Sequence, residues 1–177
     1  MKPSSREKIA EGRFWEEKSL SEMTPAEWEA LCDGCALCCL IKLEDEDTGA
    51  TSYTDIVCQL LDEASCRCSD YPNRSARVPG CVRLTPETIA EAAPWMPPSC
   101  AYRRLHEGRA LPDWHPLVTG DKGSVAAAGC SVRGRVVCET AVPEAKWPDR
   151  VVAWPRRVDR AKFAGRWRRA RENSRNP

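Results

Sequence analysis

The chain has 177 residues, of which 42% are hydrophobic and 30% charged, and its formal net charge is +1. These values are typical of a water-soluble globular protein of about one domain. No apolar run approaches the roughly 18 residues of a membrane span. The segment Met1–Lys8 also lacks the apolar core of a signal peptide. We therefore expect a cytoplasmic protein without a membrane span.

The charge is unevenly distributed along the chain. Residues 156–177 carry a net charge of +7, which leaves −6 (1 − 7) for residues 1–155. The basic C-terminal tail can form a helix with Phe163, Trp167 and Ala170 on one face, and such a helix can contact nucleic acid or an anionic surface. We favour a solvated extension instead, because runs of charge commonly behave that way.

The N-terminal part predicts two helices. Residues 4–20 suggest a polar helical arm anchored by Phe14, Trp15 and Leu20. Thr24–Glu27 has the residues of a capping box, with proline at the first helical position, so a second helix should begin there. This helix leads directly into Cys32.

The stretch Cys32-Asp33-Gly34-Cys35-Ala36-Leu37-Cys38-Cys39 places four thiols within eight residues. Gly34 stands where a turn needs positive φ. Short strands are expected at 40–43 and 51–61, joined by an acidic turn at 44–49, because β-branched residues are frequent there. This hairpin would bring Cys58 back beside the first four cysteines.

The later part of the chain predicts short elements separated by turns. Residues 66–81 are rich in turn residues and poor in hydrophobic periodicity, so this stretch would need a crosslink or a metal to hold its shape. The expected elements are helices at 85–93 and 97–108, a rigid aromatic loop at 111–116, a strand at 131–137 and irregular chain from 143 to 155.

His115 lies between Trp114 and Pro116 and is the one titratable residue of special interest. A histidine held rigidly in this way can be a metal ligand or a proton carrier. We favour a hydrogen-bonded structural histidine. No phosphate-binding loop, serine-nucleophile elbow or H-E-x-x-H helix is present, so the sequence names no catalytic residue.

The eleven cysteines point to metal chemistry more than to disulfides, because the expected compartment is reducing. Several separated motifs together resemble the bacterial UPF0260 (YcgN-like) family of the CxxCxxCC group, whose members are described as zinc- or iron-chelating. The resemblance covers roughly residues 13–155. The motifs that carry it are residues 32–39, 42–49, 66–71, 81–86 and 114–117.

Nine cysteines are candidate metal ligands in this interpretation. Cys130 and Cys138 are left out, because cysteine is not expected at those two positions in similar proteins. Nine thiols exceed the four that one zinc ion or one [4Fe–4S] cluster takes, so some belong to a second centre or have another role. The candidates are Cys32, Cys35, Cys38, Cys39, Cys58, Cys66, Cys68, Cys81 and Cys100.

We therefore expect a small α+β domain at residues 21–155, with short helices around a cysteine-rich hairpin, between a helical arm (1–20) and the basic tail (156–177). Its thiolates suit an iron–sulfur cluster, of the [4Fe–4S] type, or Zn²⁺. The first functional hypothesis is a metal-binding protein with a redox or metal-dependent role and a protein or small-molecule partner. The alternative is a zinc-stabilised interaction module without catalytic activity, and the sequence leaves open whether the protein is an enzyme.

Overall fold

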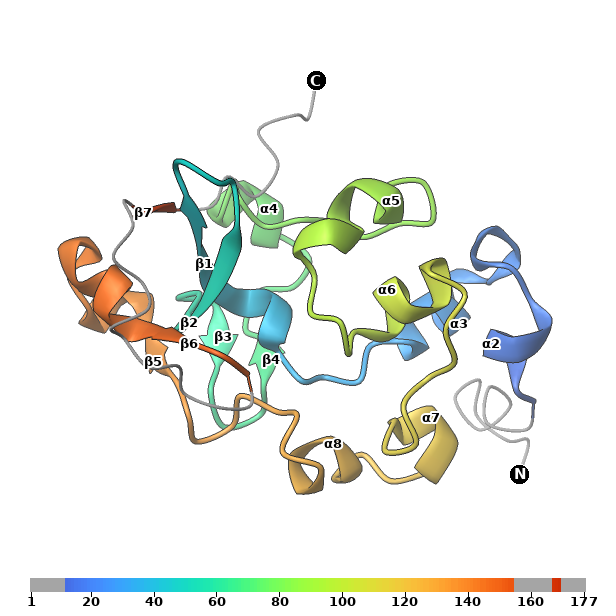
Figure 1. The fold of residues 1–177 in the computed structure, drawn as a ribbon. Helices are drawn as coiled ribbons and strands as arrows, with labels where there is room; N and C mark the ends of the chain where they lie inside the picture. Colours follow the sequence, from blue (N-terminus) through green and yellow to red (C-terminus); the bar gives the residue numbers. More distant parts are fainter. Residues whose placement is uncertain (1–11, 155–166, 170–177) are drawn as a thin grey trace. The chain divides into compact units, whose positions relative to one another are not determined.

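The computed structural model describes residues 12–154 and 167–169, and it has the predicted α+β character. The chain forms two compact units, each built from two separate stretches of sequence (Figure 1). Unit 1 comprises Met1–Gly34 and Leu84–Ala128, and unit 2 comprises Cys35–Arg83 and Gly129–Pro177. The domain boundaries predicted from the sequence stay a prediction.

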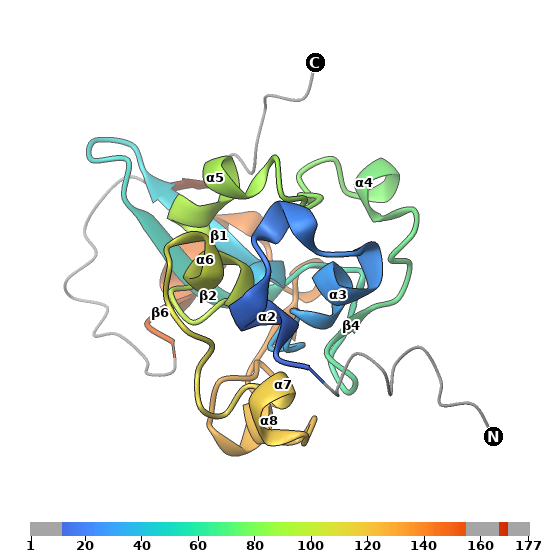
Figure 2. The same ribbon diagram turned by 90° about the vertical axis from the view of Figure 1, so that its right-hand side faces the viewer.

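Unit 1 consists of short helical segments (Figure 2), and aromatic and aliphatic side chains are buried among them. The rings of Trp28 and Tyr102 are 4.7 Å apart. The Tyr102 hydroxyl donates to the Trp28 carbonyl oxygen at 2.9 Å, and the Trp28 indole donates to the Leu84 carbonyl oxygen at 3.1 Å. The helical segments are α2 (Phe14–Glu17), η1 (Leu20–Glu22), α3 (Pro25–Ala30), α5 (Ile89–Ala92), η3 (Ala93–Trp95), α6 (Ala101–His106), α7 (Pro116–Thr119) and α8 (Ser124–Ala127).

The predicted capping box is confirmed, whereas other helix boundaries were wrong. The Thr24 hydroxyl accepts from the Glu27 backbone N–H, and the Glu27 carboxylate accepts from the Thr24 N–H. The helix expected at 85–93 begins at Ile89, because Thr85 and Thr88 bond to each other in a preceding turn. The α-helix ends at Ala92, two residues before Pro94, and is followed by the 3₁₀ turn η3, which tolerates proline near its start. The described part of the predicted arm, from residue 12, forms only α2 and the start of η1.

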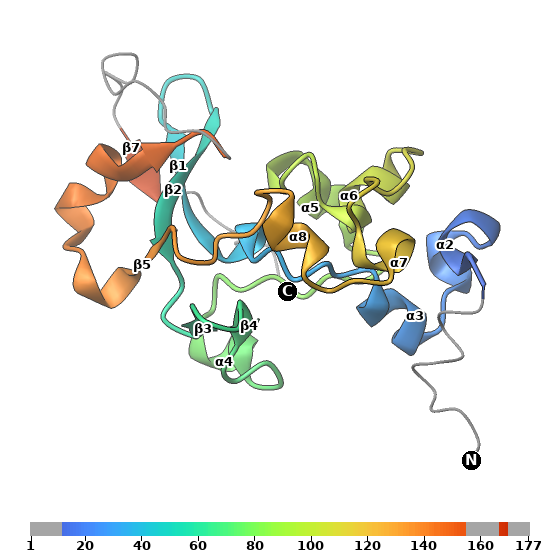
Figure 3. The same ribbon diagram turned by 90° about the horizontal axis from the view of Figure 1, so that it is seen from below.

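Unit 2 contains two sheets, which Figure 3 shows from below. In the larger sheet, β2 pairs antiparallel with β1 and β6 and parallel with β5, and β7 pairs antiparallel with the other edge of β1. In the smaller sheet, β3 pairs antiparallel with β4. The strands and helical turns are η2 (Leu37–Cys39), β1 (Leu40–Asp45), β2 (Thr51–Val57), β3 (Leu61–Asp62), β4 (Arg67–Cys68), α4 (Arg74–Arg77), β5 (Val137–Cys138), η4 (Glu139–Ala141), η5 (Glu144–Arg150), β6 (Val151–Val152) and β7 (Trp167–Arg169).

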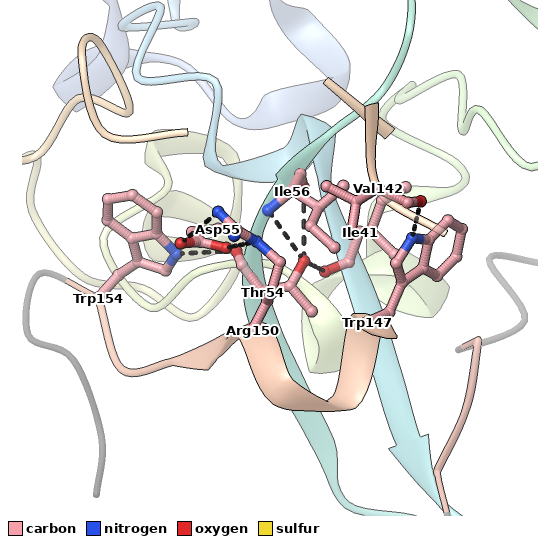
Figure 4. A network of polar contacts seen from close by, with 8 residues as sticks. All are labelled: Ile41, Thr54, Asp55, Ile56, Val142, Trp147, Arg150 and Trp154. Carbon is pink, nitrogen blue, oxygen red and sulfur yellow. Dashed lines mark hydrogen bonds and ion pairs between the residues drawn. The ribbon is translucent and has the colours of Figure 1, made fainter. Parts of the chain in front are cut away.

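The predicted β1–β2 hairpin is confirmed, and its register contains an irregularity. Leu40 pairs with Val57 and Lys42 with Tyr53, so Ile41 lies where the ladder shifts. The Thr54 hydroxyl donates to the Ile41 carbonyl oxygen at 2.7 Å, and Thr54 is fully buried (Figure 4). This side chain supplies a partner to a buried carbonyl at the irregular position.

One face of this sheet packs against the 3₁₀ segment η5. Trp147 is buried there, and its indole donates to the Val142 carbonyl oxygen at 3.0 Å. Arg150 forms two hydrogen bonds with the Asp55 carboxylate, of 2.7 and 3.0 Å (Figure 4). A planar guanidinium matches a carboxylate in this bidentate manner. The buried cluster consists of Ile41, Leu43, Ile56, Trp147 and Val151.

Three further predictions in unit 2 were wrong or incomplete. The strand expected at 51–61 ends at Val57, where a turn closed by the Leu61 N–H and the Cys58 carbonyl begins. The strand expected at 131–137 is reduced to Val137–Cys138. In the basic tail, for which a solvated extension was favoured over a helix, residues 167–169 form β7, while 156–166 and 170–177 lie outside the described residues.

Replacing Thr54 by valine tests the role of its buried hydroxyl. Thr54→Val keeps the side-chain shape but leaves the Ile41 carbonyl without this donor, so the free energy of unfolding should fall by about 1–3 kcal/mol. Urea denaturation followed by circular dichroism measures the change.

Thr51→Val is the matched control, because it makes the same chemical change at an exposed position of β2. Its effect should stay within about 0.5 kcal/mol. Equal effects of the two substitutions would contradict the role assigned to the Thr54 hydroxyl.

Candidate metal centre

The cysteine-rich turn has a tightly bent backbone. Gly34 adopts φ 74°, as predicted, and Ala36 adopts φ 60°. A non-glycine residue in this left-handed region is uncommon and costs free energy. The bend at Ala36 starts η2, which carries Cys38 and Cys39 directly before β1. Cys38 is exposed and Cys39 half-buried.

Cys58 lies beside this turn, as the predicted hairpin requires. Its backbone N–H donates to the Cys39 carbonyl oxygen at 3.0 Å. Its sulfur accepts from the Leu60 N–H, with a separation of 3.5 Å between nitrogen and sulfur. A backbone donor aimed at sulfur stabilises a thiolate more than a thiol, so Cys58 is placed in a suitable environment for a metal ligand.

The small β3–β4 sheet places two further cysteines. Cys68 pairs with Leu61, and the following Ser69 N–H donates to the Leu60 carbonyl oxygen at 2.7 Å. Cys66 is buried, with φ 55°, and its sulfur lies 3.5 Å from the Ser131 hydroxyl oxygen. The two members of the Cys66/Cys68 pair therefore have different surroundings.

Cys81 follows α4 and is half-buried, with its N–H donating to the Val78 carbonyl oxygen at 2.8 Å. Burial raises the pKa of the Cys81 thiol to about 11. The positive charge of Arg74 opposes this rise in pKa. Negative charge on Cys58, Cys38 and Cys68 adds to the rise, so these four thiols interact electrostatically.

Cys39 belongs to the same group of thiols. Its pKa lies well above the usual value, first because of a side-chain hydrogen bond with Cys38, then because of burial and of negative charge on Cys38 and Cys58. We call Cys38, Cys39, Cys58, Cys68 and Cys81 the five-thiol cluster. Negative charge on neighbouring thiols disfavours the ionised forms of Cys39 and Cys81, and a bound cation would remove that repulsion.

The five members of this cluster all lie in unit 2, as do Cys35 and Cys66, and the Cys35 carbonyl accepts from the Val132 N–H at 3.0 Å. Cys32 and Cys100 belong to unit 1, where Cys100 precedes α6. Among the described residues, no group of three or more cysteine, histidine or carboxylate side chains is placed to hold a metal ion. The ligand set as a whole stays a prediction.

The donor chemistry of the five-thiol cluster fits a thiophilic metal. Sulfur ligands suit zinc, copper(I) and iron–sulfur clusters. Four members of the cluster could bind one zinc ion or one [4Fe–4S] cluster. When bound, such a group supplies either a fixed crosslink or a site for electron transfer.

Lys42 was missed by the sequence analysis. It is only 1% exposed, and its ammonium donates to the carbonyl oxygens of Cys38 at 2.8 Å and Leu40 at 2.9 Å. Its positive charge also opposes the rise in the pKa of Cys39. The sequence signal for its burial was the position of this lysine between Ile41 and Leu43, in a predicted strand whose other residues are apolar.

His115 is a buried structural histidine, as favoured from the sequence. Its Nδ1 accepts from the Leu117 N–H at 3.1 Å, so Nε2 is the donor to the Leu31 carbonyl oxygen, 3.0 Å away. Both ring nitrogens are therefore engaged with the backbone of unit 1. This arrangement begins α7 and fixes the end of α3.

Part of the chain is similar to a known protein domain. Residues 31–101 match the family model CxxCxxCC, described as "Putative zinc- or iron-chelating domain". This segment includes all nine candidate ligands. Residues 31–101 are thus similar to the CxxCxxCC domain. Among the residues that the structure describes, no helix is long and apolar enough to cross a membrane.

The chain belongs to the UPF0260 family. It is 60% identical over 146 residues to a UPF0260 protein of Parvibaculum lavamentivorans, which covers 82% of this chain and 95% of that relative. A relative from Rhodopseudomonas palustris is 54% identical, covering 87% and 88% of the two chains, and one from Caulobacter vibrioides is 59% identical, covering 75% and 82%. No solved structure matches the chain.

The buried neutral His115 predicts a loss of stability in acid. Burial lowers its pKa below the ordinary 6.5, so the unfolded chain binds the proton more readily than the folded one. The free energy of unfolding should therefore be fully present above pH 6.5 and fall as the pH drops toward the folded-state pKa, by up to about 1.4 kcal/mol per pH unit.

Chemical denaturation between pH 7.5 and 5.0 measures this slope. His115→Gln should flatten it, whereas His106→Gln, at an exposed position of α6, should leave it unchanged. An identical pH slope in the wild type and in His115→Gln would refute the role of His115.

Proposed function

We propose that the five-thiol cluster binds a metal through cysteine thiolates, as an iron–sulfur cluster of the [4Fe–4S] type with a redox role. The observation that carries this proposal is the gathering of thiols from four separate segments: η2, the end of β2, β4 and the turn after α4. If these cysteines only filled space in the core, their sulfurs would have no reason to lie near enough for the charge of one to affect the pKa of another.

Two features support a redox role. Cys38 is exposed, so electrons or small molecules can reach the cluster from solvent. The N–H donor to the Cys58 sulfur also belongs to the class of contacts that adjusts the reduction potential of sulfur-ligated iron. A cysteine-rich site that binds metal suits a reducing compartment, and we propose the cytoplasm as the location.

The second candidate function is a zinc-stabilised module in which the metal only holds the fold. It is favoured by the thin packing around the cysteines between residues 62 and 83, where Cys66 and Val78 are the buried residues. Strands β3 and β4 have two residues each. A segment with so little apolar core gains its shape from a metal more readily than from packing.

Purification without oxygen separates the two candidates. The absorption spectrum is recorded, and iron, acid-labile sulfide and zinc are assayed per chain. A brown protein with iron and sulfide in equal amounts is expected. Colourless protein with stoichiometric zinc would replace the cluster by the zinc module, and protein that takes up neither metal would refute metal binding.

The same assays on two cysteine variants test the site. Cys58→Ser should lose the metal and lower the melting temperature by about 10 °C or more, because binding energy is folding energy at such sites. Cys138→Ser is the matched control, since the Cys138 sulfur lies 3.2 Å from the Thr140 hydroxyl and is outside the five-thiol cluster. Equal metal content in both variants would contradict the assignment of Cys58.

A further inference from the structure

A fully buried lysine is the most unusual charged residue in unit 2. Lys42 is only 1% exposed, although lysine is almost never fully buried unless its charge is compensated. It lies in β1, three residues after Cys39, with Ile41 and Leu43 on either side. Removing an ammonium from water costs stability, so its retention at this position calls for a compensating interaction.

The contacts of Lys42 converge on the cysteine turn. Its ammonium donates to the carbonyl oxygens of Cys38 and Leu40, at 2.8 and 2.9 Å, and lies 5.7 Å from the centre of the Tyr53 ring. These two carbonyls flank Cys39 in sequence. The lysine therefore fixes the backbone from which the Cys38 and Cys39 side chains extend.

The positive charge of Lys42 lies beside the cysteine turn. Its ammonium is within hydrogen-bonding distance of the Cys38 carbonyl oxygen, directly before Cys39 in the chain. Four thiolates around one divalent cation carry a net charge of about −2, and a [4Fe–4S] core held by four thiolates is likewise anionic. A buried ammonium beside such a centre lowers the free energy of the negative charge, and the centre in turn compensates the ammonium.

We propose that Lys42 is a positioning residue of the metal centre, which holds the Cys38–Cys39 turn and balances the negative charge of the metal-bound thiolates. This inference rests on the proposed function, because it needs a thiolate-ligated metal. It adds that the site is built for an anionic centre and that its reduction potential depends on a residue that is not a ligand.

Substitution of Lys42 by glutamine separates charge from hydrogen bonding. Lys42→Gln keeps N–H donors but removes the positive charge, and Lys146→Gln makes the same change at an exposed position of η5. Co²⁺ is titrated into each metal-free protein without oxygen, and the thiolate-to-cobalt charge-transfer absorption reports binding. Affinity for Co²⁺ should fall about 10- to 100-fold in Lys42→Gln, as for other groups that support metal ligands, and stay unchanged in Lys146→Gln.

The reduction potential gives a readout that a purely structural role would not move. Each protein is reconstituted with iron and sulfide without oxygen, and its midpoint potential is measured. The potential should be lower in Lys42→Gln than in the wild type and Lys146→Gln, because a nearby cation favours the reduced, more negative state.

The outcomes distinguish this inference from the proposed function. If the wild type binds neither Co²⁺ nor iron, the proposed function fails and the role of Lys42 fails with it. If the wild type binds metal but Lys42→Gln shows the same affinity and potential, the inference alone is overturned. A weaker affinity with an unchanged potential would overturn the charge-balancing role. If circular dichroism shows that Lys42→Gln does not fold, Lys42→Met takes its place with the same expectations.

Discussion

The antiparallel pairing of β1 with β2 is the constraint on which the candidate site depends. Cys39 directly precedes β1 and Cys58 directly follows β2, so closing the hairpin brings both thiols to the same end of the sheet. The hydrogen bond from the Cys58 N–H to the Cys39 carbonyl fixes this end. The irregular register lies at Ile41, the second residue of β1, and the Ile41 carbonyl oxygen accepts a hydrogen bond from the Thr54 hydroxyl. The hairpin therefore fixes the positions of the Cys39 and Cys58 backbones relative to each other.

Charge is the second determinant of the site. Thiols that lie near one another in half-buried positions resist ionisation, as the raised pKa values of Cys39 and Cys81 express. The positive charge of the fully buried Lys42 counteracts the rise in the pKa of Cys39, and that of the half-buried Arg74 counteracts the rise in the pKa of Cys81. A cation bound among the thiols would complete this balance. Repulsion between neighbouring thiolates makes the metal-free cluster costly to ionise, and a bound cation would relieve this repulsion.

Local sequence signals predicted those parts of the structure that depend on a few neighbouring residues. The capping box at Thr24, the positive φ at Gly34 and the return of Cys58 to Cys39 all follow from such signals. The strand expected at 131–137 was wrong over most of its length, because within this range only Val137 pairs with β2, whereas the Val132 N–H donates to the Cys35 carbonyl oxygen. Burial of Lys42 depends on what covers β1 in three dimensions, and β7 pairs with β1 across more than 120 residues, so neither could be derived from a local pattern.

The central claim is that this chain holds a metal through its cysteine sulfurs. X-ray absorption at the edge of the metal that copurifies with the oxygen-free protein counts the ligand atoms directly. We expect about four sulfur neighbours at roughly 2.3 Å, with an additional short iron–iron distance when the group is a cluster. A first shell of nitrogen and oxygen atoms, or fewer than two sulfur neighbours, would contradict the account.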